Sequence, residues 1–217
     1  MDSDNLIIMS VRIFFNDSKS QNRDRYKNCN LNLEKKGLRV FGVAESFRKF
    51  NIKSTLAGVV MRRDLIIDGA IFGTATLGGN DSTENILYMF KSLKRDDINC
   101  IMLGGLIISM YNIIDAQLIQ NETGLPVIGI TFEDSKGIES NIRYHFADSF
   151  QLKLDQYAKL GRRDQVTLKT GKSIFIRYWG LSPKDAIRLL NSFTLQGAIP
   201  EPIRIAKLVA RASTNMI

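Results

Sequence analysis

The chain of 217 residues is long enough for one domain with a large core, and 44% hydrophobic with 24% charged residues is typical of globular proteins. Its two distant cysteines, Cys29 and Cys100, exclude a disulfide framework and a cysteine zinc site. It has no run of about eighteen apolar residues and begins with the acidic MDSD, so we expect a cytoplasmic protein without a membrane span. The net charge of +8 favours an acidic partner, most commonly nucleic acid, although solubility alone is the alternative.

The first part of the chain divides into a polar segment and a run of strands. Residues 16–36 are rich in Asn and Lys without hydrophobic periodicity, so we expect residues 1–36 to form an N-terminal extension and 37–217 a single domain. A short connection between the second and third apolar segments predicts an antiparallel hairpin. The three predicted strands lie within 38–43, 54–63 and 64–79.

The middle of the chain alternates helical and buried-strand patterns. Residues 80–93 have helical spacing behind Asp81 or Ser82 as N-cap, and 109–124 are predicted to be a helix that ends at Gly124. The apolar runs within 98–108 and 125–132 predict strands buried on both faces. The order β-β-β-α-β-α-β predicts an α/β fold of ribonuclease H-like architecture. It would be a mixed five-stranded sheet, antiparallel on one side, with helices on its faces.

The last third is predicted to add helices and one hairpin. Residues 135–160 carry a helical apolar face, and 165–180 form a hairpin that turns at Thr170–Lys172. Residues 182–194 read as a helix with Ser182 as N-cap, and a closing helix follows within 199–213.

These segments together resemble an archaeal family with an endonuclease V-like fold. The resemblance runs from Leu38 to Ala212 and is carried by GVAESF, AGVVMRR, NDSTENI, IMLGGLIISMYNIID, TGLPVIGI, GLSPKDAIRLL and IPEPIRIAKLVA. It implies a DNA endonuclease, a hydrolase of phosphodiester bonds, that acts at deaminated bases such as deoxyuridine or deoxyinosine in DNA repair.

The resemblance also implies a metal cofactor, Mg²⁺ or else Mn²⁺, held by acids at the ends of the first and fourth strands. The family pattern at the first position is Gly-Ile-Asp-Asp, where this chain has Gly42-Val43-Ala44-Glu45. The fourth strand ends at Gly104, where endonuclease V has an acid. Three hypotheses stay open: a nuclease with rearranged acids, a catalytically inactive nucleic-acid-binding protein of the same fold, and an interaction module that does not bind nucleic acid.

The predicted catalytic residues are Glu45, Asp81 and Glu84, with Glu45 and Asp81 as metal ligands. Each has a structural alternative. Strand alternation turns Glu45 to the face opposite Ala44. Asp81 fits the N-cap of the next helix, and Glu84 fits the favourable end of its dipole.

Basic and polar side chains supply the predicted DNA contacts. Asn112 follows the fourth strand, and in open α/β sheets ligands gather outside the carboxyl ends of strands. Arg204 is a fork donor for phosphate, or else pairs with Glu201 at helical spacing. The full set of predicted DNA-binding residues is Arg48, Lys49, Arg62, Arg63, Asn112 and Arg204.

Other polar and aromatic residues are further candidates for the site, each with a structural alternative. Asp68 fits a solvent-facing strand position, and Asp115 fits a helix cap. His145, the only histidine, fits a surface or packing role better than a catalytic one. Phe47, Phe50, Tyr178 and Trp179 are candidates to stack on an unpaired base, or else belong to the core.

Overall fold

The computed structural model describes residues 31–48, 50–134, 137–147 and 149–216. The predicted N-terminal extension lies largely outside this part of the chain, as does Lys49. No helix among the described residues is long and apolar enough to cross a membrane.

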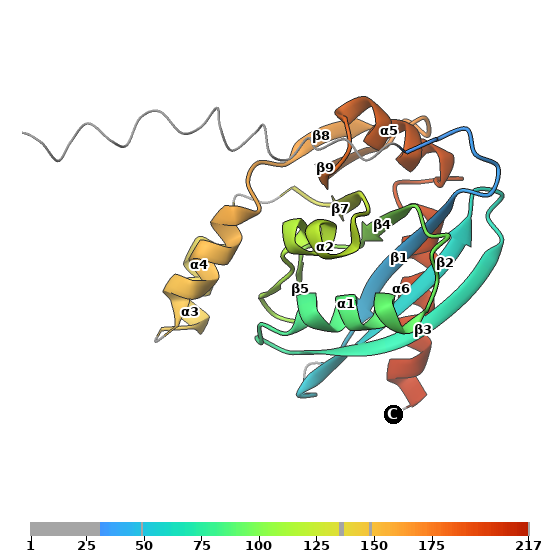
Figure 1. Ribbon diagram of the computed structural model, residues 1–217. Coiled ribbons are helices and arrows are strands. Elements are labelled where there is room, and N and C mark those ends of the chain that lie inside the picture. The colour runs from blue at the N-terminus through green and yellow to red at the C-terminus, as the bar shows by residue number, and fades with distance from the viewer. Residues whose placement is uncertain (1–30, 49, 135–136, 148, 217) are drawn as a thin grey trace, which may run out of the picture.

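Seven strands form one mixed sheet in the spatial order β3-β2-β1-β4-β7-β9-β8 (Figure 1). The first three strands are an antiparallel meander, β4 and β7 continue parallel to β1, and β9 and β8 return antiparallel. The predicted five strands are therefore present in their predicted order, and the predicted hairpin joins the same sheet through β9. The strands are β1 (Arg39–Ser46), β2 (Lys53–Arg62), β3 (Ile67–Thr76), β4 (Cys100–Leu103), β7 (Val127–Thr131), β8 (Asp164–Thr167) and β9 (Ser173–Trp179).

Helices cover both faces of the sheet, with α1 and α2 on one face and α6 on the other (Figure 1). A short two-stranded sheet, β5 (Ile107–Ile108) with β6 (Asn112–Ile113), precedes α2. The helices are α1 (Ser82–Ser92), α2 (Ala116–Thr123), α3 (Glu139–His145), α4 (Phe150–Lys159), α5 (Pro183–Ser192) and α6 (Glu201–Met216).

Two helix predictions were wrong in part. The helix predicted over 109–124 begins only at Ala116, because Ser109, Met110 and Tyr111 have φ of 45°, 53° and 70°, in the left-handed region that a right-handed helix cannot contain. The helix predicted over 135–160 is two helices, α3 and α4. The chain leaves α3 at Phe146, whose φ of −128° and ψ of 50° are not helical.

The two core layers follow the side-chain alternation of β1. Val40 and Ala44 pack in the layer under α5 and α6, whereas Phe41 and Val43 pack in the layer under α1 and α2. Helix α6 lies very close to the sheet, because a Cβ on Gly42 would lie only 2.5 Å from Cβ of Pro202. A glycine in β1 therefore lets the start of α6 rest against the strand itself.

Candidate functional site

One edge of the sheet carries Glu45 and Asp81, two of the predicted catalytic residues. Val43 near the end of β1 lies opposite Leu103 at the end of parallel β4, and the end of β3 at Thr76 lies opposite the start of β2 at Lys53. We call this the carboxyl edge, and we call the opposite one, where β1 and β4 begin, the amino edge. Glu45 belongs to the carboxyl edge, and so do the segments that follow β3 and β4.

Among the described residues, Glu45 accepts hydrogen bonds from Ser109 alone. Both of its carboxylate oxygens accept from the Ser109 backbone N–H at 2.9 Å, and Oε2 also accepts from the Ser109 hydroxyl at 2.6 Å. The same hydroxyl lies 2.6 Å from Oγ of Ser54 in β2. As strand alternation predicts, Glu45 lies on the face of Leu56, its partner in β2, and not on the face of Ala44. In this arrangement its carboxylate holds the segment that follows β4.

The residues that Glu45 holds form a strained turn, Ser109-Met110-Tyr111, which we call the left-handed turn. Three consecutive residues with positive φ and a side chain are costly, and such conformations persist only where the surroundings enforce them. Besides Glu45, the Gly78 N–H donates to the Ser109 carbonyl at 2.7 Å, and Lys153 donates to the Tyr111 carbonyl at 2.8 Å. Hydrogen bonds from three other segments thus fix the turn.

Asp81 stands at the N-cap position of α1, but its carboxylate does not cap the helix. It accepts from the backbone N–H of Thr76 at 3.0 Å, the Thr76 hydroxyl at 2.7 Å and the Asn112 amide at 2.7 Å. Burial raises the pKa of Asp81, but these hydrogen bonds outweigh it and hold that pKa below its ordinary value. Asp81 therefore stays ionised and ties the end of β3 to β6.

Asn112, a predicted DNA contact, is fully buried in β6. Its amide donates to Asp81 and to the Thr76 carbonyl, and its carbonyl oxygen accepts from the Ser82 N–H at 3.2 Å. The structure thus brings Asn112 beside the predicted ligand Asp81, where it crosslinks three segments of the carboxyl edge.

Lys153 of α4 belongs to this site although the sequence did not single it out. Its side chain is buried, and its ammonium donates to the carbonyls of Gly79 and Tyr111. Burial lowers the pKa of Lys153, and the negative charge of Asp81 partly opposes that shift. A lysine on an amphipathic helix is ordinarily expected at the surface, so the local sequence does not predict that Lys153 is buried.

Among the described residues, the remaining predicted residues take no part in the hydrogen bonds of this cluster. Glu84 is exposed on the first turn of α1. Arg48 is exposed after β1, whereas Arg62 and Arg63 lie at the end of β2, on the amino edge. Arg204 donates to Glu201 at 2.8 Å, which is the alternative that its helical spacing allowed. Those predicted DNA contacts that the structure describes therefore do not form one patch.

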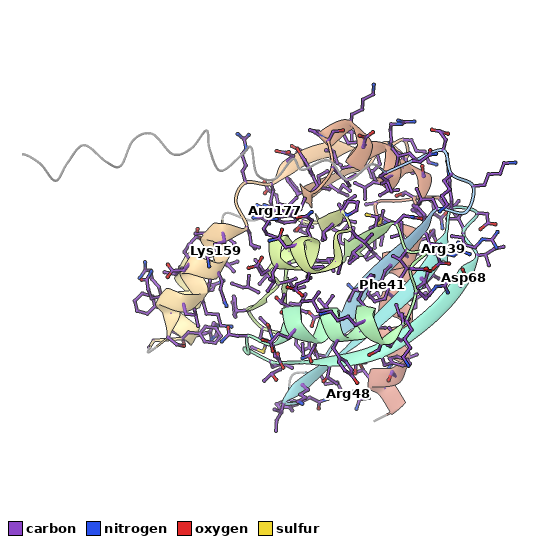
Figure 2. The ribbon with its side chains drawn as sticks, in the orientation of Figure 1. Arg39, Phe41, Arg48, Asp68, Lys159 and Arg177 are labelled. Carbon is purple, nitrogen blue, oxygen red and sulfur yellow. The ribbon has the colours of Figure 1, made fainter. Side chains whose placement is uncertain are left out.

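The amino edge carries a network of ion pairs instead. Asp68 accepts from Arg39 and Arg95, and Arg95 also binds Asp97 at 2.8 Å. Figure 2 shows Arg39 and Asp68 together at one end of the sheet and Arg48 at the other. Hydrogen bonds from Arg39 and Arg95 hold the pKa of Asp68 below its usual value. The strand carboxylate predicted to face solvent is therefore a member of this network.

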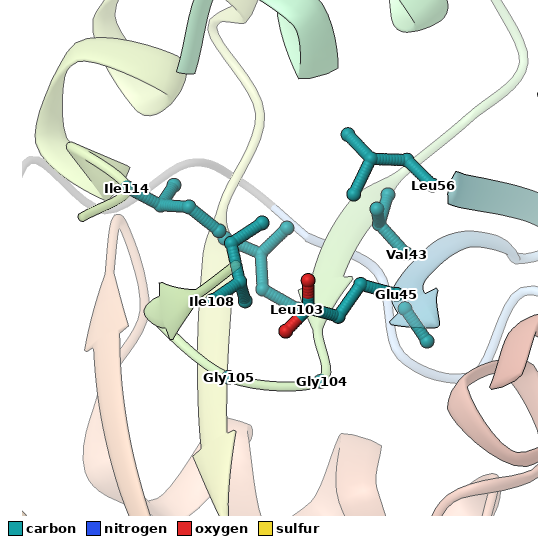
Figure 3. Close-up of a pocket in the computed structure, with 9 residues that line it drawn as sticks. Val43, Glu45, Leu56, Leu103, Gly104, Gly105, Ile108 and Ile114 are labelled. Atoms are coloured by element: carbon teal, nitrogen blue, oxygen red, sulfur yellow. The ribbon is translucent and has the colours of Figure 1, made fainter. Parts of the chain in front are cut away.

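Space beside Ala44 and Gly104 is closed by apolar groups. Ala44 is 6% exposed and packs in the same core layer as Ile203 of α6, and a Cβ on Gly104 would lie 2.8 Å from Cγ2 of Ile203. The cavity between these positions and Glu45 has a volume of about 10 Å³, room for one water at most (Figure 3). At the two positions where the resemblance implies acids, α6 and aliphatic side chains fill the site.

The carboxylates at this edge are already bound by hydrogen-bond donors. Within the described ranges, no group of three or more His, Cys, Asp or Glu side chains could hold a metal ion. Both oxygens of Glu45 and of Asp81 already accept from N–H or O–H donors. Their present task is to hold the segments that follow β3 and β4.

The chain matches a known protein family over most of its length. The model of the family described as "Endonuclease dU" matches residues 36–214. A UPF0215 protein of Pyrobaculum calidifontis is 39% identical over 169 residues, which cover 77% of this chain and 92% of that protein. A UPF0215 protein of Pyrobaculum aerophilum is 36% identical over 176 residues, which cover 81% of this chain and 94% of that protein.

Solved structures support the same fold. An Archaeoglobus fulgidus protein of unknown function superimposes with a TM-score of 0.71 at 27% identity, over 81% of this chain and 98% of that one. Endonuclease V of Ciona intestinalis, solved with an inosine-containing DNA, gives a TM-score of 0.59 at 17% identity, over 91% of this chain and 95% of that one. At that identity the likeness establishes the endonuclease V-like fold that the sequence predicted, and no more.

Proposed function

Because the chain belongs to the endonuclease dU family, we propose that it is a DNA endonuclease of the endonuclease V type that acts at deoxyuridine in DNA. The observation that carries the proposal is the family match, which spans residues 36–214 and so includes the whole carboxyl edge. The net charge of +8 adds the long-range attraction that a polyanionic substrate needs. Deoxyuridine arises in DNA by deamination, so the proposed role is in DNA repair.

A metal requirement is a separate part of the proposal. Hydrolysis of a phosphodiester needs an activated water and stabilisation of the departing oxygen, which Mg²⁺ supplies in many nucleases. The carboxylates of the described residues do not form such a centre, so we derive no step through an ion. The Mg²⁺ or Mn²⁺ dependence implied by the resemblance stays a prediction that the cleavage experiment decides.

Within the proposal, Glu45 and Asp81 act by fixing the segments that border the substrate. Glu45 holds the left-handed turn through Ser109, and Asp81 holds the end of β3 against Asn112. We expect loss of either carboxylate to impair activity by displacing these segments. Pre-organised surroundings of this kind are what precise placement of a substrate requires.

The second candidate function is DNA binding without cleavage. One observation favours it: Ile203 packs where a side chain at Gly104 would have to lie, and Ala44 is buried in the same layer. A chain that kept the fold after losing the acids of the first and fourth strands would have this apolar filling. It would bind DNA in a salt-dependent manner without cutting it.

Cleavage of defined duplexes distinguishes the two candidates. The full-length chain is incubated with end-labelled duplexes that contain one deoxyuridine, one deoxyinosine or no lesion, with Mg²⁺, with Mn²⁺ or with EDTA. We expect strand cleavage at deoxyuridine above the unmodified duplex, with a loss of about tenfold or more in Glu45→Ala. Little change is expected in the control Asp96→Ala, which removes an exposed acid before β4 that belongs to no predicted site.

The same duplexes supply the binding measurement. If no duplex is cut under any condition but affinity falls steeply with added salt, the endonuclease proposal fails and the binding protein stands. If affinity is the same at low and high salt, neither candidate survives, because a polyanion partner releases counterions on binding.

A further inference from the structure

Aromatic side chains gather beside the left-handed turn. The Tyr111 ring lies 5.5 Å from the His145 ring and 5.8 Å from the Phe146 ring, measured between centroids. The Tyr144 ring meets His145 edge-on, with centroids 5.0 Å apart. These four residues, which we call the aromatic cluster, join the segment after β4 to the end of α3.

Much of the aromatic cluster faces solvent. The Tyr144 side chain is 83% exposed, His145 is exposed and Tyr111 is half-buried. A ring that exists to pack α3 against the domain would bury its faces, and Tyr144 does not. Exposed neighbouring rings are instead what a stacking surface for a planar ligand requires.

Cationic side chains accompany the rings. The Arg143 guanidinium lies 4.9 Å from the centre of the Phe150 ring, and the Lys153 ammonium lies 5.1 Å from that of Phe146. Arg143 is exposed on α3, so it remains accessible to an anion beside the aromatic cluster. Rings for stacking next to an exposed fork donor match the two parts of a nucleotide, a base and a phosphate.

The position of Tyr111 is fixed at a cost in backbone strain. Its φ of 70° is rare for an aromatic residue, and the turn is held by Glu45 at Ser109 and by Lys153 at Tyr111 itself. Strained residues that surrounding groups hold in place cluster at ligand sites. Here the strain presents Tyr111 to α3 next to the carboxyl edge.

We propose that Tyr111, Tyr144, His145 and Phe146 form a stacking site for an unpaired nucleobase of DNA. The proposal rests on the proposed function only in taking DNA as the partner, and it needs no cleavage. An unpaired base exposes both π-faces, whereas a paired base inside a duplex exposes neither. The aromatic cluster therefore makes the protein prefer DNA with an extrahelical or single-stranded base.

Direct binding of three labelled DNAs tests the site. Fluorescence anisotropy compares a fully paired duplex, the same duplex with one bulged nucleotide and a single strand, each in EDTA so that no strand is cut. We expect the wild-type chain to bind the bulged duplex about tenfold more tightly than the paired duplex. A bulged 2-aminopurine should also change its fluorescence on binding, because stacking on a ring quenches it.

Exposed tyrosines provide a matched pair of variants. Tyr144→Ala should lose most of the preference for the bulged duplex and leave affinity for the paired duplex unchanged, while Tyr144→Phe should keep it, since the ring persists. Tyr88→Ala removes a tyrosine that is 72% exposed on α1, outside the aromatic cluster, and should match wild type. Both tyrosines are exposed enough that their removal leaves the fold intact.

Three results would overturn the site. Equal wild-type affinity for the paired and the bulged duplex would show that no base is stacked, while DNA binding itself would stand. A Tyr144→Ala variant that behaves like Tyr88→Ala, or that weakens both duplexes equally, would remove the role of the ring. Absence of binding to all three DNAs would end this inference, while the cleavage experiment with Mg²⁺ or Mn²⁺ decides the proposed function separately.

Discussion

The carboxyl edge and the amino edge of the same sheet both carry acidic residues, but the groups that bind these carboxylates differ between the two edges. At the amino edge Asp68 and Asp97 are neutralised by Arg39 and Arg95, so the edge is a closed network of opposite charges. At the carboxyl edge Glu45 and Asp81 accept from amides and hydroxyls, and the cation that acts on Asp81 is the buried Lys153, which donates to backbone carbonyls.

This difference shows that the partner of a carboxylate, and not its presence, determines its role. Ion pairs between two acids and two arginines tie β1 and β3 to the segment before β4. Carboxylates bound by neutral donors instead order the segments that follow β3 and β4, including a strained turn. The amino edge therefore ties strands together through ion pairs, whereas the carboxyl edge is the one that, in our proposal, organises a ligand surface.

The largest effect is expected from forcing an acid back into the closed part of the carboxyl edge. Gly104→Asp would place Cβ 2.8 Å from Cγ2 of Ile203 and a carboxylate in apolar surroundings, so the free energy of unfolding should fall by about 3 kcal/mol or more. Urea unfolding followed by circular dichroism measures it.

A second glycine, in a strand that has room for a side chain, serves as the control for Gly104→Asp. It shows how much stability changes when a glycine alone is replaced. A Cβ on Gly69 would meet its nearest atom only at 3.6 Å, so Gly69→Ala should change stability by about 1 kcal/mol or less. Wild-type stability in Gly104→Asp, above all with new Mg²⁺-dependent cleavage, would show that α6 does not close the site.

A smaller loss is expected from removing the acceptor of the left-handed turn. Glu45→Ala leaves the Ser109 N–H and hydroxyl without this acceptor, and the free energy of unfolding should fall by about 2 kcal/mol. Glu45→Gln keeps one acceptor oxygen and should lose less. Chemical denaturation of both variants is compared with Glu84→Ala, an exposed acid on α1. Equal stability of Glu45→Ala and Glu84→Ala would contradict the role of Glu45.

The amino edge predicts how the protein responds to acid. Hydrogen bonds from Arg39 and Arg95 hold the pKa of Asp68 below its ordinary 3.8. Above that pH, the contribution of ionised Asp68 to the free energy of unfolding is complete. This contribution is lost as the pH falls through the lower pKa that Asp68 has in the folded state, because the unfolded chain binds more protons than the folded chain in that range. Thermal unfolding between about pH 5 and about pH 2 should be less pH-dependent in Asp68→Asn than in wild type. Identical pH profiles would exclude the network as a source of acid sensitivity.

The smallest effect is expected from Lys153 at alkaline pH. Burial lowers the pKa of Lys153 below its ordinary 10.5, so between the folded and the unfolded value the unfolded chain binds more protons. The free energy of unfolding should therefore rise as the pH rises through that window. Lys153→Met should lack this gain relative to wild type when thermal unfolding is followed toward about pH 10. Parallel curves for the two proteins would contradict it.

Several local features could be predicted because neighbouring residues decide them. Asp115 accepts from the Leu118 N–H at 2.9 Å as the cap of α2, and Gly124 ends that helix with a φ of 68°. Ser182 caps α5, with Pro183 in its first turn. The order of the strands followed from hydrophobic runs and short connections, which local sequence also contains.

The site was predictable only in part, because distant residues decide it. Strand alternation placed Glu45 opposite Ala44, but its partner Ser109 is 64 residues away in the chain. The left-handed turn contains no glycine that would predict positive φ. It is stabilised by hydrogen bonds with Glu45, Gly78 and Lys153. The burial of Lys153 likewise depends on where α4 docks.

By itself the sequence determined the strand order, the helix caps, the absence of acids at Ala44 and Gly104, and the family resemblance. Tertiary structure alone decided that Ile203 fills the space beside those two residues, that the hairpin of β8 and β9 extends the sheet, and that Glu45 binds a turn. The physical reason is that periodicity and caps arise from interactions a few residues apart. The partner of a carboxylate and the conformation of a strained turn depend on contacts between segments that only the folded chain brings together.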